Sequence, residues 1–271
     1  MHEGTAAKAL AHDFARTDRH IKDDILRQFR VKGLPVKAEE SLMSVEECKD
    51  VAAKAALREV RDGMVLGLGT GSTVERFAAL LSDEVKKGVK VKVVPTSYHS
   101  MQMAAKYGLE VVSAELVDGI DLIVDGADEV DRRLNMIKGR GAALAREKVV
   151  ACMALRRVYI VSYDKLVEKL CSTKPIPIEV LPFAYKYVIK RITELGGDAV
   201  LREAGRFKDG PLVTDNGNFI IDARFKPLDN PEELESRIKM IPGVVEVGLF
   251  CGIADVVYVG WPERVEVLTR S

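Results

Sequence analysis

Short runs of Val, Leu and Ile alternate with segments of helical periodicity between residues 64 and 162, and this alternation constrains the fold more than any other feature. The apolar runs, interpreted as strands, occupy 64–68, 89–94, 109–112, 120–124 and 158–162, and the predicted helices occupy 73–81, 100–107 and 142–155. Strands that are apolar throughout are buried on both faces, and helical crossovers connect parallel neighbours. The sequence therefore predicts a doubly wound, Rossmann-like α/β domain with a mostly parallel sheet.

The pattern changes after Lys174, where Pro175, Pro177 and Pro182 mark a boundary. The next segments predict a helix over 185–195, a strand over 199–202, a hairpin turning at 215–217 and a helix over 231–240. Two last strands, over 244–250 and 255–259, are expected to return to the first sheet. We therefore expect a catalytic α/β domain of residues 44–173 plus 246–271, with a smaller α+β lid domain at 174–245 inserted into it.

Residues 1–43 differ in composition from the rest of the chain. They carry both charge signs, and their many acidic residues do not suit a transit peptide. The segment Ser44-Val45-Glu46-Glu47 has the form of a capping box and predicts a helix that begins there. We interpret 1–43 as an extension of unknown role, with Met43 as an alternative start.

Charge and residue usage exclude several classes of function. The charges of the 41 basic and 41 acidic side chains sum to zero, so the net charge does not indicate nucleic acid or an anionic membrane as a partner. No apolar run approaches the ~20 residues of a membrane span. Four cysteines without a CxxC pair indicate a reducing cytoplasm. Three of the four histidines lie in the first twenty residues, which disfavours a histidine-based metal site and points to carboxylate and lysine chemistry.

A glycine-rich turn, Gly67-Leu68-Gly69-Thr70-Gly71-Ser72-Thr73, connects a predicted strand to a predicted helix. Glycines let a backbone approach a ligand, and the free N–H groups of the next helix favour an anion. The dinucleotide fingerprint would need glycine in place of Ser72. A methyltransferase that binds S-adenosylmethionine would need an acid after the next strand, where 94–98 has none. We therefore expect Thr70, Gly71, Ser72 and Thr73 to bind phosphate or sugar hydroxyls.

A second candidate segment places carboxylates where the apolar run 120–124 ends, at the sheet edge that binds ligands in open α/β folds. Asp125 and Asp128, with Gly126 and Ala127 between them, are expected to be functional. Glu129 and Asp131 are interpreted as part of a solvated acidic turn. A divalent metal is a competing use for such carboxylates, although no further ligand motif supports one.

The third segment is Lys138-Gly139-Arg140-Gly141, followed by a predicted helix. Helical spacing puts Glu147 on a stripe with Ala143, Val150 and Ala154, which is otherwise apolar. Desolvation raises the pKa of such a carboxylate, and raised basicity suits a general base near neutral pH. We therefore expect Glu147 to be a base close to Lys138.

Together these segments resemble the ribose-5-phosphate isomerase type A family. The family patterns are GxGTGST at 67–73, TS at 96–97, DGADE at 125–129, KGxGxAxxxEK at 138–148, DKLVxxL at 164–170, PIEV at 177–180, TDNGN at 214–218 and IPGVVEVGLF at 241–250. The resemblance runs from about residue 45 to about residue 262. Two positions depart from it: Arg140 interrupts a run usually drawn as glycines, and Cys171 stands where a glycine is common.

The resemblance implies interconversion of ribose 5-phosphate and ribulose 5-phosphate through an enediolate, without metal or organic cofactor, in a homodimer or homotetramer. It implies Glu147 as proton acceptor, Asp125 and Asp128 for hydroxyl orientation and proton shuttling, and Lys138 with the 139–141 N–H groups for the oxyanion and phosphate. Lys165 and Lys49 are further candidate contacts of the sugar phosphate. The alternative from another class is a non-catalytic sugar-phosphate sensor, which would need no buried base.

Overall fold

The computed structural model describes residues 36–206 and 208–270, with side chains described from Val45 onward. The chain divides into two compact units, Met1–Ser44 and Val45–Ser271, and the second unit carries all the features below. Most of the predicted extension 1–43 lies outside the described residues. Helix α3 spans Val36–Leu57, so the helix start predicted at Ser44 is wrong. The preceding residues, such as Ala38, Glu39 and Glu40, favour helix and do not stop it.

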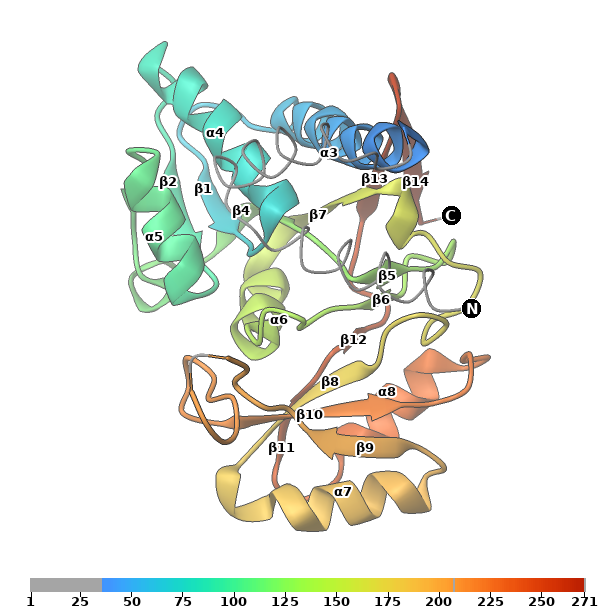
Figure 1. Cartoon of the computed structure of the whole chain (residues 1–271). Helices are drawn as coiled ribbons and strands as arrows, with labels where there is room; N and C mark the ends of the chain where they lie inside the picture. The colour runs from blue at the N-terminus through green and yellow to red at the C-terminus, as the bar shows by residue number, and fades with distance from the viewer. Residues whose placement is uncertain (1–35, 207, 271) are drawn as a thin grey trace. The chain divides into compact units, whose positions relative to one another are not determined.

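A seven-stranded sheet forms the larger part of the fold (Figure 1). Its order is β14-β13-β7-β4-β1-β2-β3, and every pair is parallel except β13 with β14. The strands are β1 Val65–Leu68, β2 Lys92–Pro95, β3 Glu110–Val111, β4 Ile120–Asp125, β7 Ala154–Ser162, β13 Val256–Trp261 and β14 Arg264–Thr269. The predicted α/β architecture with a mostly parallel sheet is therefore confirmed.

Helices α4 (Ser72–Lys86), α5 (Tyr98–Lys106) and α6 (Leu144–Met153) follow β1, β2 and the Lys138 segment, as predicted. Helix α4 buries Val74, Phe77, Ala78 and Leu81, which is the apolar stripe that its sequence predicts. Gly260 on β13 lies so close to the backbone of Cys48 on α3 that a Cβ would overlap it. The glycine therefore lets α3 pack directly on β13. No helix among the described residues is long and apolar enough to cross a membrane.

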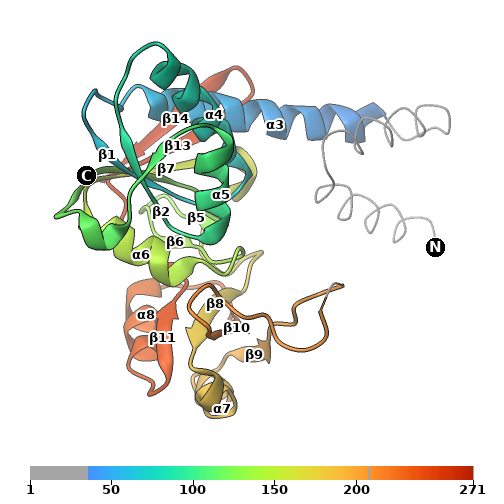
Figure 2. The same cartoon turned by 90° about the vertical axis from the view of Figure 1, so that its left-hand side faces the viewer.

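Two smaller antiparallel sheets contain most of the rest. The four-stranded sheet has the order β11-β8-β10-β9, with β8 Ile176–Val180, β9 Asp198–Leu201, β10 Phe219–Arg224 and β11 Val244–Val247. Helices α7 (Tyr185–Glu194) and α8 (Pro231–Lys239) bury apolar side chains in the same cluster. The three-stranded sheet pairs β6 (Met136–Ile137) with β5 (Glu129–Val130) and β12 (Leu249–Phe250). Short 3₁₀ turns lie at Ala114–Leu116 (η1), Tyr163–Lys165 (η2) and Pro182–Ala184 (η3). Both views show α6 between the seven-stranded and the four-stranded sheet (Figures 1 and 2).

The strand predicted over 244–250 does not return to the first sheet. It divides at Gly248 into β11, which joins the four-stranded sheet, and β12, which joins the three-stranded sheet. Gly248 donates to the carbonyl of Pro177 at 2.7 Å and accepts from the N–H of Lys138 at 2.8 Å. A Cβ at Gly248 would overlap the carbonyl oxygens of Lys138 and Pro177, so glycine permits the close approach that redirects the strand. Only the second predicted strand, as β13, joins the first sheet.

Candidate active site

The carboxyl ends of β2, β1 and β4 lie side by side and bring three candidate segments together. The N–H of Thr70 donates to Asp125 Oδ1 at 3.2 Å, and Thr70 Oγ1 lies 2.8 Å from Ser97 Oγ. A Cβ at Gly69 would overlap the Asp125 carboxylate, so the glycine makes room for this acid. The glycine turn, the TS segment and the acidic turn therefore meet at the sheet edge that the sequence predicts.

A buried ion cluster lies at this edge. Lys138 Nζ is 2.9 Å from Asp125 Oδ2 and 3.2 Å from Glu147 Oε2, and it donates to the carbonyl of Gly126 at 2.5 Å. The exposed fractions of Asp125, Lys138 and Glu147 are 0%, 3% and 4%. One ammonium group therefore lies between two buried carboxyl groups and can compensate the charge of only one of them, and the expected proximity of Glu147 to Lys138 is observed.

The cluster sets the protonation of its members. Burial, reinforced by the charge of Asp125, raises the pKa of Glu147 to about 8 against the opposing effect of Lys138. Burial alone would lower the pKa of Lys138, but the carboxylates of Asp125 and Glu147 outweigh it, so its pKa is raised and it stays charged. Apart from the ion pairs with Lys138, Asp125 Oδ2 and Glu147 Oε2 accept no hydrogen bond from the described residues. Two acceptor atoms thus remain for a ligand.

The Lys138 loop wraps around Asp128. The N–H of Arg140 donates to Asp128 Oδ2 at 3.0 Å, while the Arg140 side chain is exposed. Gly139 has φ of +105° and Ala142 has φ of +59°, so the loop turns through left-handed conformations on the way into α6. Gly141 is exposed in the same loop, and Gly126 and Ala127 are half-buried beside Asp128.

Glu129 and Asp131 do not form the solvated acidic turn that the sequence suggests. Glu129 has no exposed surface and accepts hydrogen bonds from the N–H groups of Cys171, Thr173 and Lys174 and from Thr173 Oγ1. Asp131 is 3% exposed and accepts from the N–H groups of Arg133 and Asn135. Buried carboxylates are tolerated where donors converge on them. The donors to Glu129 come from a segment distant in sequence, whereas those to Asp131 lie two and four residues further along the chain. Cys171 has φ of +67°, which explains why a glycine suits that position.

The remaining candidates, all among the described residues, form no hydrogen bond or ion pair with Asp125, Lys138 or Glu147 in the structure. Gly71, with φ of +116°, precedes α4, and Ser72 and Thr73 are its first residues. Lys165, in the turn after β7, pairs with Asp164 at 2.6 Å, and Lys49, on α3, pairs with Glu46 at 2.6 Å. The structure shows no hydrogen bond or ion pair from either lysine to Asp125, Lys138 or Glu147. Their roles therefore stay predictions.

Several residues at the site escape sequence reasoning. Lys138 Nζ lies over the rings of Tyr159 and Phe250, 5.6 and 5.4 Å from their centroids. Both rings are buried, and burial raises the pKa of Tyr159 well above its usual value. The sequence pattern around Tyr159 and Phe250 does not show that either ring contacts a lysine. The hairpin turn 214–218 also reaches the site region, and its TDNGN motif is the only sequence signal for it.

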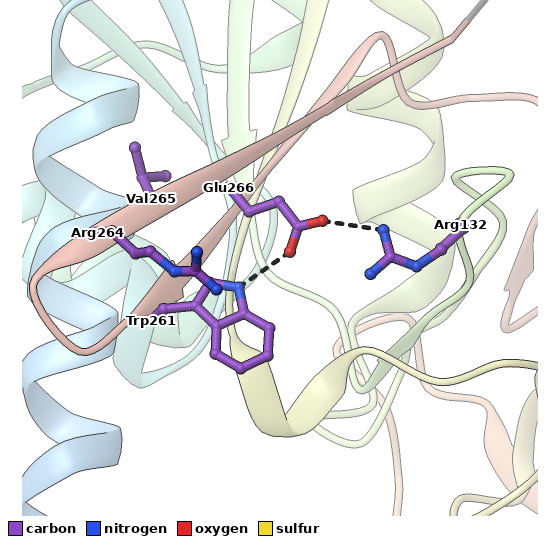
Figure 3. Close-up of a pocket in the computed structure, with 5 residues that line it drawn as sticks. All are labelled: Arg132, Trp261, Arg264, Val265 and Glu266. Carbon is purple, nitrogen blue, oxygen red and sulfur yellow. Dashed lines mark hydrogen bonds and ion pairs between the residues drawn. The ribbon is translucent and has the colours of Figure 1, made fainter.

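One cavity of the structure lies outside the candidate site. A cavity of about 520 Å³ is lined by Arg132, Trp261, Arg264, Val265 and Glu266, none of which belongs to the buried cluster (Figure 3). Glu266 there accepts from Trp261 Nε1 at 3.0 Å and pairs with Arg132 at 2.9 Å.

In the part of the chain that the structure describes, no group of three or more His, Cys, Asp or Glu side chains is placed to hold a metal ion.

Comparison with known proteins finds consistent relatives. A family model described as ribose 5-phosphate isomerase A (phosphoriboisomerase A) matches residues 92–264. The ribose-5-phosphate isomerase A of Pyrococcus abyssi is 49% identical over 84% of this chain and 100% of its own length. That of Thermosynechococcus vestitus is 49% identical over 80% of this chain and 92% of its own.

Solved structures agree with the sequence relatives. A D-ribose-5-phosphate isomerase in complex with phospho-erythronic acid superposes with a TM-score of 0.81 at 48% identity, covering 83% of this chain and 99% of that one. The ribose 5-phosphate isomerase of Plasmodium falciparum gives 0.77 at 35% identity, covering 83% and 98%.

Proposed function

Because this chain belongs to the ribose-5-phosphate isomerase A family, we propose that it interconverts D-ribose 5-phosphate and D-ribulose 5-phosphate with Glu147 as the general base. The reaction is an aldose–ketose isomerisation of the pentose phosphate pathway. The observation that carries the assignment of the base is the position of Glu147, which is buried 3.2 Å from Lys138 with its pKa raised to about 8. A carboxylate with that basicity exchanges protons with carbon acids better than an ordinary one.

In the forward reaction, Glu147 takes the proton from C2 of the open-chain aldose, and the electron pair of that C–H bond forms the C1–C2 double bond of an enediolate. The carbonyl π electrons move onto O1, next to the Lys138 ammonium, which stabilises the negative charge. The proton is then returned from Glu147 to C1, while a proton moves from O2 to O1. The sum is an isomerisation that consumes no co-reactant.

The other residues bind and orient the sugar phosphate. Asp125 Oδ2 is an acceptor with only Lys138 beside it, which suits a substrate hydroxyl and the proton transfer between O1 and O2. Asp128 orients hydroxyls from the other side of the acidic turn. The loop 139–141, residues 70–73 around the start of α4, and Lys165 and Lys49 supply donors and positive charge for the phosphate. Within the loop the Arg140 N–H is held by Asp128, so the Gly141 N–H is the donor to the phosphate.

A coupled assay of ribulose 5-phosphate formation from ribose 5-phosphate, run with excess EDTA, tests the function. We expect turnover that EDTA does not reduce, because the carboxylates and Lys138 perform every step of the proposed mechanism. Binding of ribose 5-phosphate without turnover would identify a sugar-phosphate sensor instead and overturn the proposal.

We also propose a cytoplasmic homodimer or homotetramer. No disulfide is present among the described residues, which suits a reducing compartment. Leu181, Phe183 and Met240 are exposed apolar side chains near one end of the four-stranded sheet, where the N–H of Leu181 donates to the carbonyl of Gly243. Exposed apolar clusters mark association surfaces. Sedimentation velocity should show no monomer at micromolar concentration, and a purely monomeric boundary would refute association.

A further inference from the structure

Arg202, which follows β9 in the four-stranded sheet, contacts the catalytic loop from outside the proposed site. Its Nη1 donates to the carbonyl oxygens of Gly139 and Arg140, both at 3.0 Å. Its Nε and Nη2 pair with the two carboxylate oxygens of Asp222 on β10, at 2.7 and 2.5 Å. A bidentate pair holds the planar guanidinium in one orientation. The remaining nitrogen is therefore fixed where the two carbonyl groups converge.

The backbone of Arg202 is anchored as well. Its N–H donates to the carbonyl of Ile220 and its carbonyl accepts from the N–H of Leu212, both at 2.8 Å. The side chain is only 16% exposed. The guanidinium thus belongs to a rigid part of the small sheet, and it contacts a loop that contains Lys138.

Peptide geometry converts this contact into an orientation of N–H groups. The structure has no cis peptide among the described residues, so each carbonyl points opposite to the N–H of the next residue. With the Gly139 carbonyl on Arg202, the N–H of Arg140 points the other way and reaches Asp128 Oδ2 at 3.0 Å. With the Arg140 carbonyl on Arg202, the N–H of Gly141 is likewise directed away from Arg202. No hydrogen bond from the Gly141 N–H to a described residue is present.

We infer that Arg202 is a positioning residue for the isomerase reaction: it holds two peptide units of the Lys138 loop so that the Arg140 N–H stays on Asp128 and the Gly141 N–H faces the sugar phosphate. The inference rests on the proposed function, and it extends the site to the Arg202–Asp222 pair of the small sheet. Gly139, with φ of +105°, gives the loop the conformation in which both carbonyls reach one nitrogen. The positive guanidinium behind the carbonyls also polarises the peptides so that their N–H ends favour anionic oxygens.

The alternative is that Arg202 only pins the loop to the small sheet for stability. Arg157 offers a matched control, because it forms a comparable bidentate pair with Asp255, at 3.0 and 2.7 Å, near the start of β7 and away from the loop. A purely structural role predicts that Arg202→Met and Arg157→Met lower the melting temperature and leave substrate binding alone.

The experiment compares wild type, Arg202→Met, Arg202→Lys and Arg157→Met in the coupled assay, with and without added phospho-erythronic acid, the compound bound in the solved relative. We expect Arg202→Met to raise KM and the inhibition constant about tenfold or more, which is about 1.4 kcal/mol of binding. The pH at which kcat is half-maximal should not move, because the Asp125–Lys138–Glu147 cluster is intact. Arg202→Lys, which folds with a single charged donor, should fall between wild type and Arg202→Met.

Arg157→Met should keep KM and the inhibition constant within twofold of wild type. The inference is overturned if folded Arg202→Met or Arg202→Lys binds as wild type does, or if Arg157→Met raises KM equally. Absence of turnover in the wild type would instead refute the proposed function. The two failures are therefore distinguishable.

Discussion

Two glutamates of this protein are equally buried, and their surroundings give them different chemistry. Glu129 accepts four hydrogen bonds from the 171–174 segment, so its charge is compensated and it orders that segment. Glu147 Oε2 accepts none and has only the Lys138 ammonium beside it, while Asp125 adds a second negative charge. Burial and Asp125 therefore raise the pKa of Glu147, and it suits a base rather than a structural anion.

Replacing Glu147 by Gln should lower kcat by about 10²–10⁴-fold with KM changed only a few-fold, because the amide cannot accept the C2 proton. In the wild type, kcat/KM should rise with pH to a plateau, and it should be half-maximal near pH 8, since only the ionised form of Glu147 is a base. Initial rates across pH 5–10 check both. Glu129→Gln, as control, should lower the free energy of unfolding without moving that midpoint. Near-normal turnover by Glu147→Gln would contradict the assignment.

The same raised pKa affects stability with a defined sign. The fold favours the protonated form of Glu147, so its stabilising contribution is complete below its ordinary pKa of 4.5 and is lost as the pH rises toward 8. Urea unfolding of wild type and Glu147→Gln at pH 5 and pH 9 should therefore show a smaller pH-dependent loss in the variant.

Among the elements, the hairpin turn 214–218 connects parts of the fold that the strand order alone leaves separate. Glu179 on β8 accepts from Thr214 Oγ1, Asn216 Nδ2 and Asn218 Nδ2, at 2.8 to 3.0 Å, and thereby shapes the turn. Asp215 Oδ2 accepts from the N–H of Tyr98 on α5 at 2.7 Å. Arg146 on α6 donates to Asn216 Oδ1 and to the Asp215 carbonyl. The turn thus ties the helix that carries the base to the helix that follows the TS segment.

Replacing Asp215 by Ala should release this tie. We expect the Tyr98 amide to exchange with deuterium about tenfold faster or more, since one hydrogen bond to a charged acceptor is worth about 1.5 kcal/mol or more. KM for ribose 5-phosphate should rise a few-fold. Asp209→Ala, an exposed acid of the preceding loop, is the matched control and should leave both unchanged. Equal exchange in Asp215→Ala and wild type would show that the contact does not hold the helix.

For the whole molecule, Lys148, the residue after the base, joins helix α6 to the two small sheets. The Lys148 ammonium lies 2.7 Å from Glu235 Oε1 on α8 and 2.9 Å from Glu246 Oε1 on β11. It also donates to the carbonyls of Val247 and Leu249, both at 2.8 Å, which belong to β11 and β12. Burial would raise the pKa of Glu246, but Lys148 and the Val247 N–H lower it. Helix α6 is thereby fixed to the small sheets directly beside Glu147.

Lys148→Met should reduce the free energy of unfolding by about 3–5 kcal/mol, because it leaves buried carboxylates and carbonyls without their cation. It should also uncouple the sheets. Trp261, the only tryptophan, lies on β13 and reports the seven-stranded sheet by fluorescence. Hydrogen exchange of β8 and β10 reports the small sheet.

In Lys148→Met the small-sheet signal should be lost at lower urea than the Trp261 signal, whereas the wild type should lose both together. Lys169→Met removes an exposed pair with Asp229 and should leave the free energy of unfolding and the coincidence of the two transitions unchanged. Coincident transitions in Lys148→Met would refute this role of the lysine.

The local pattern of the chain predicted most strands of the seven-stranded sheet and the helices α4, α5 and α6, but it missed β14 and the beginning of β7. The spacing of Glu147 predicted its burial, because periodicity records which face of an element avoids water. The motif segments also indicated the family. Tertiary structure alone decided that Glu129 and Asp131 are buried, that the 244–250 strand divides at Gly248, and that Arg202 and the 214–218 turn hold the catalytic elements. Except for Asp131, whose donors lie two and four residues away, each of these depends on hydrogen bonds between segments far apart in sequence. The partners of a polar group are settled only when such segments meet in the folded chain.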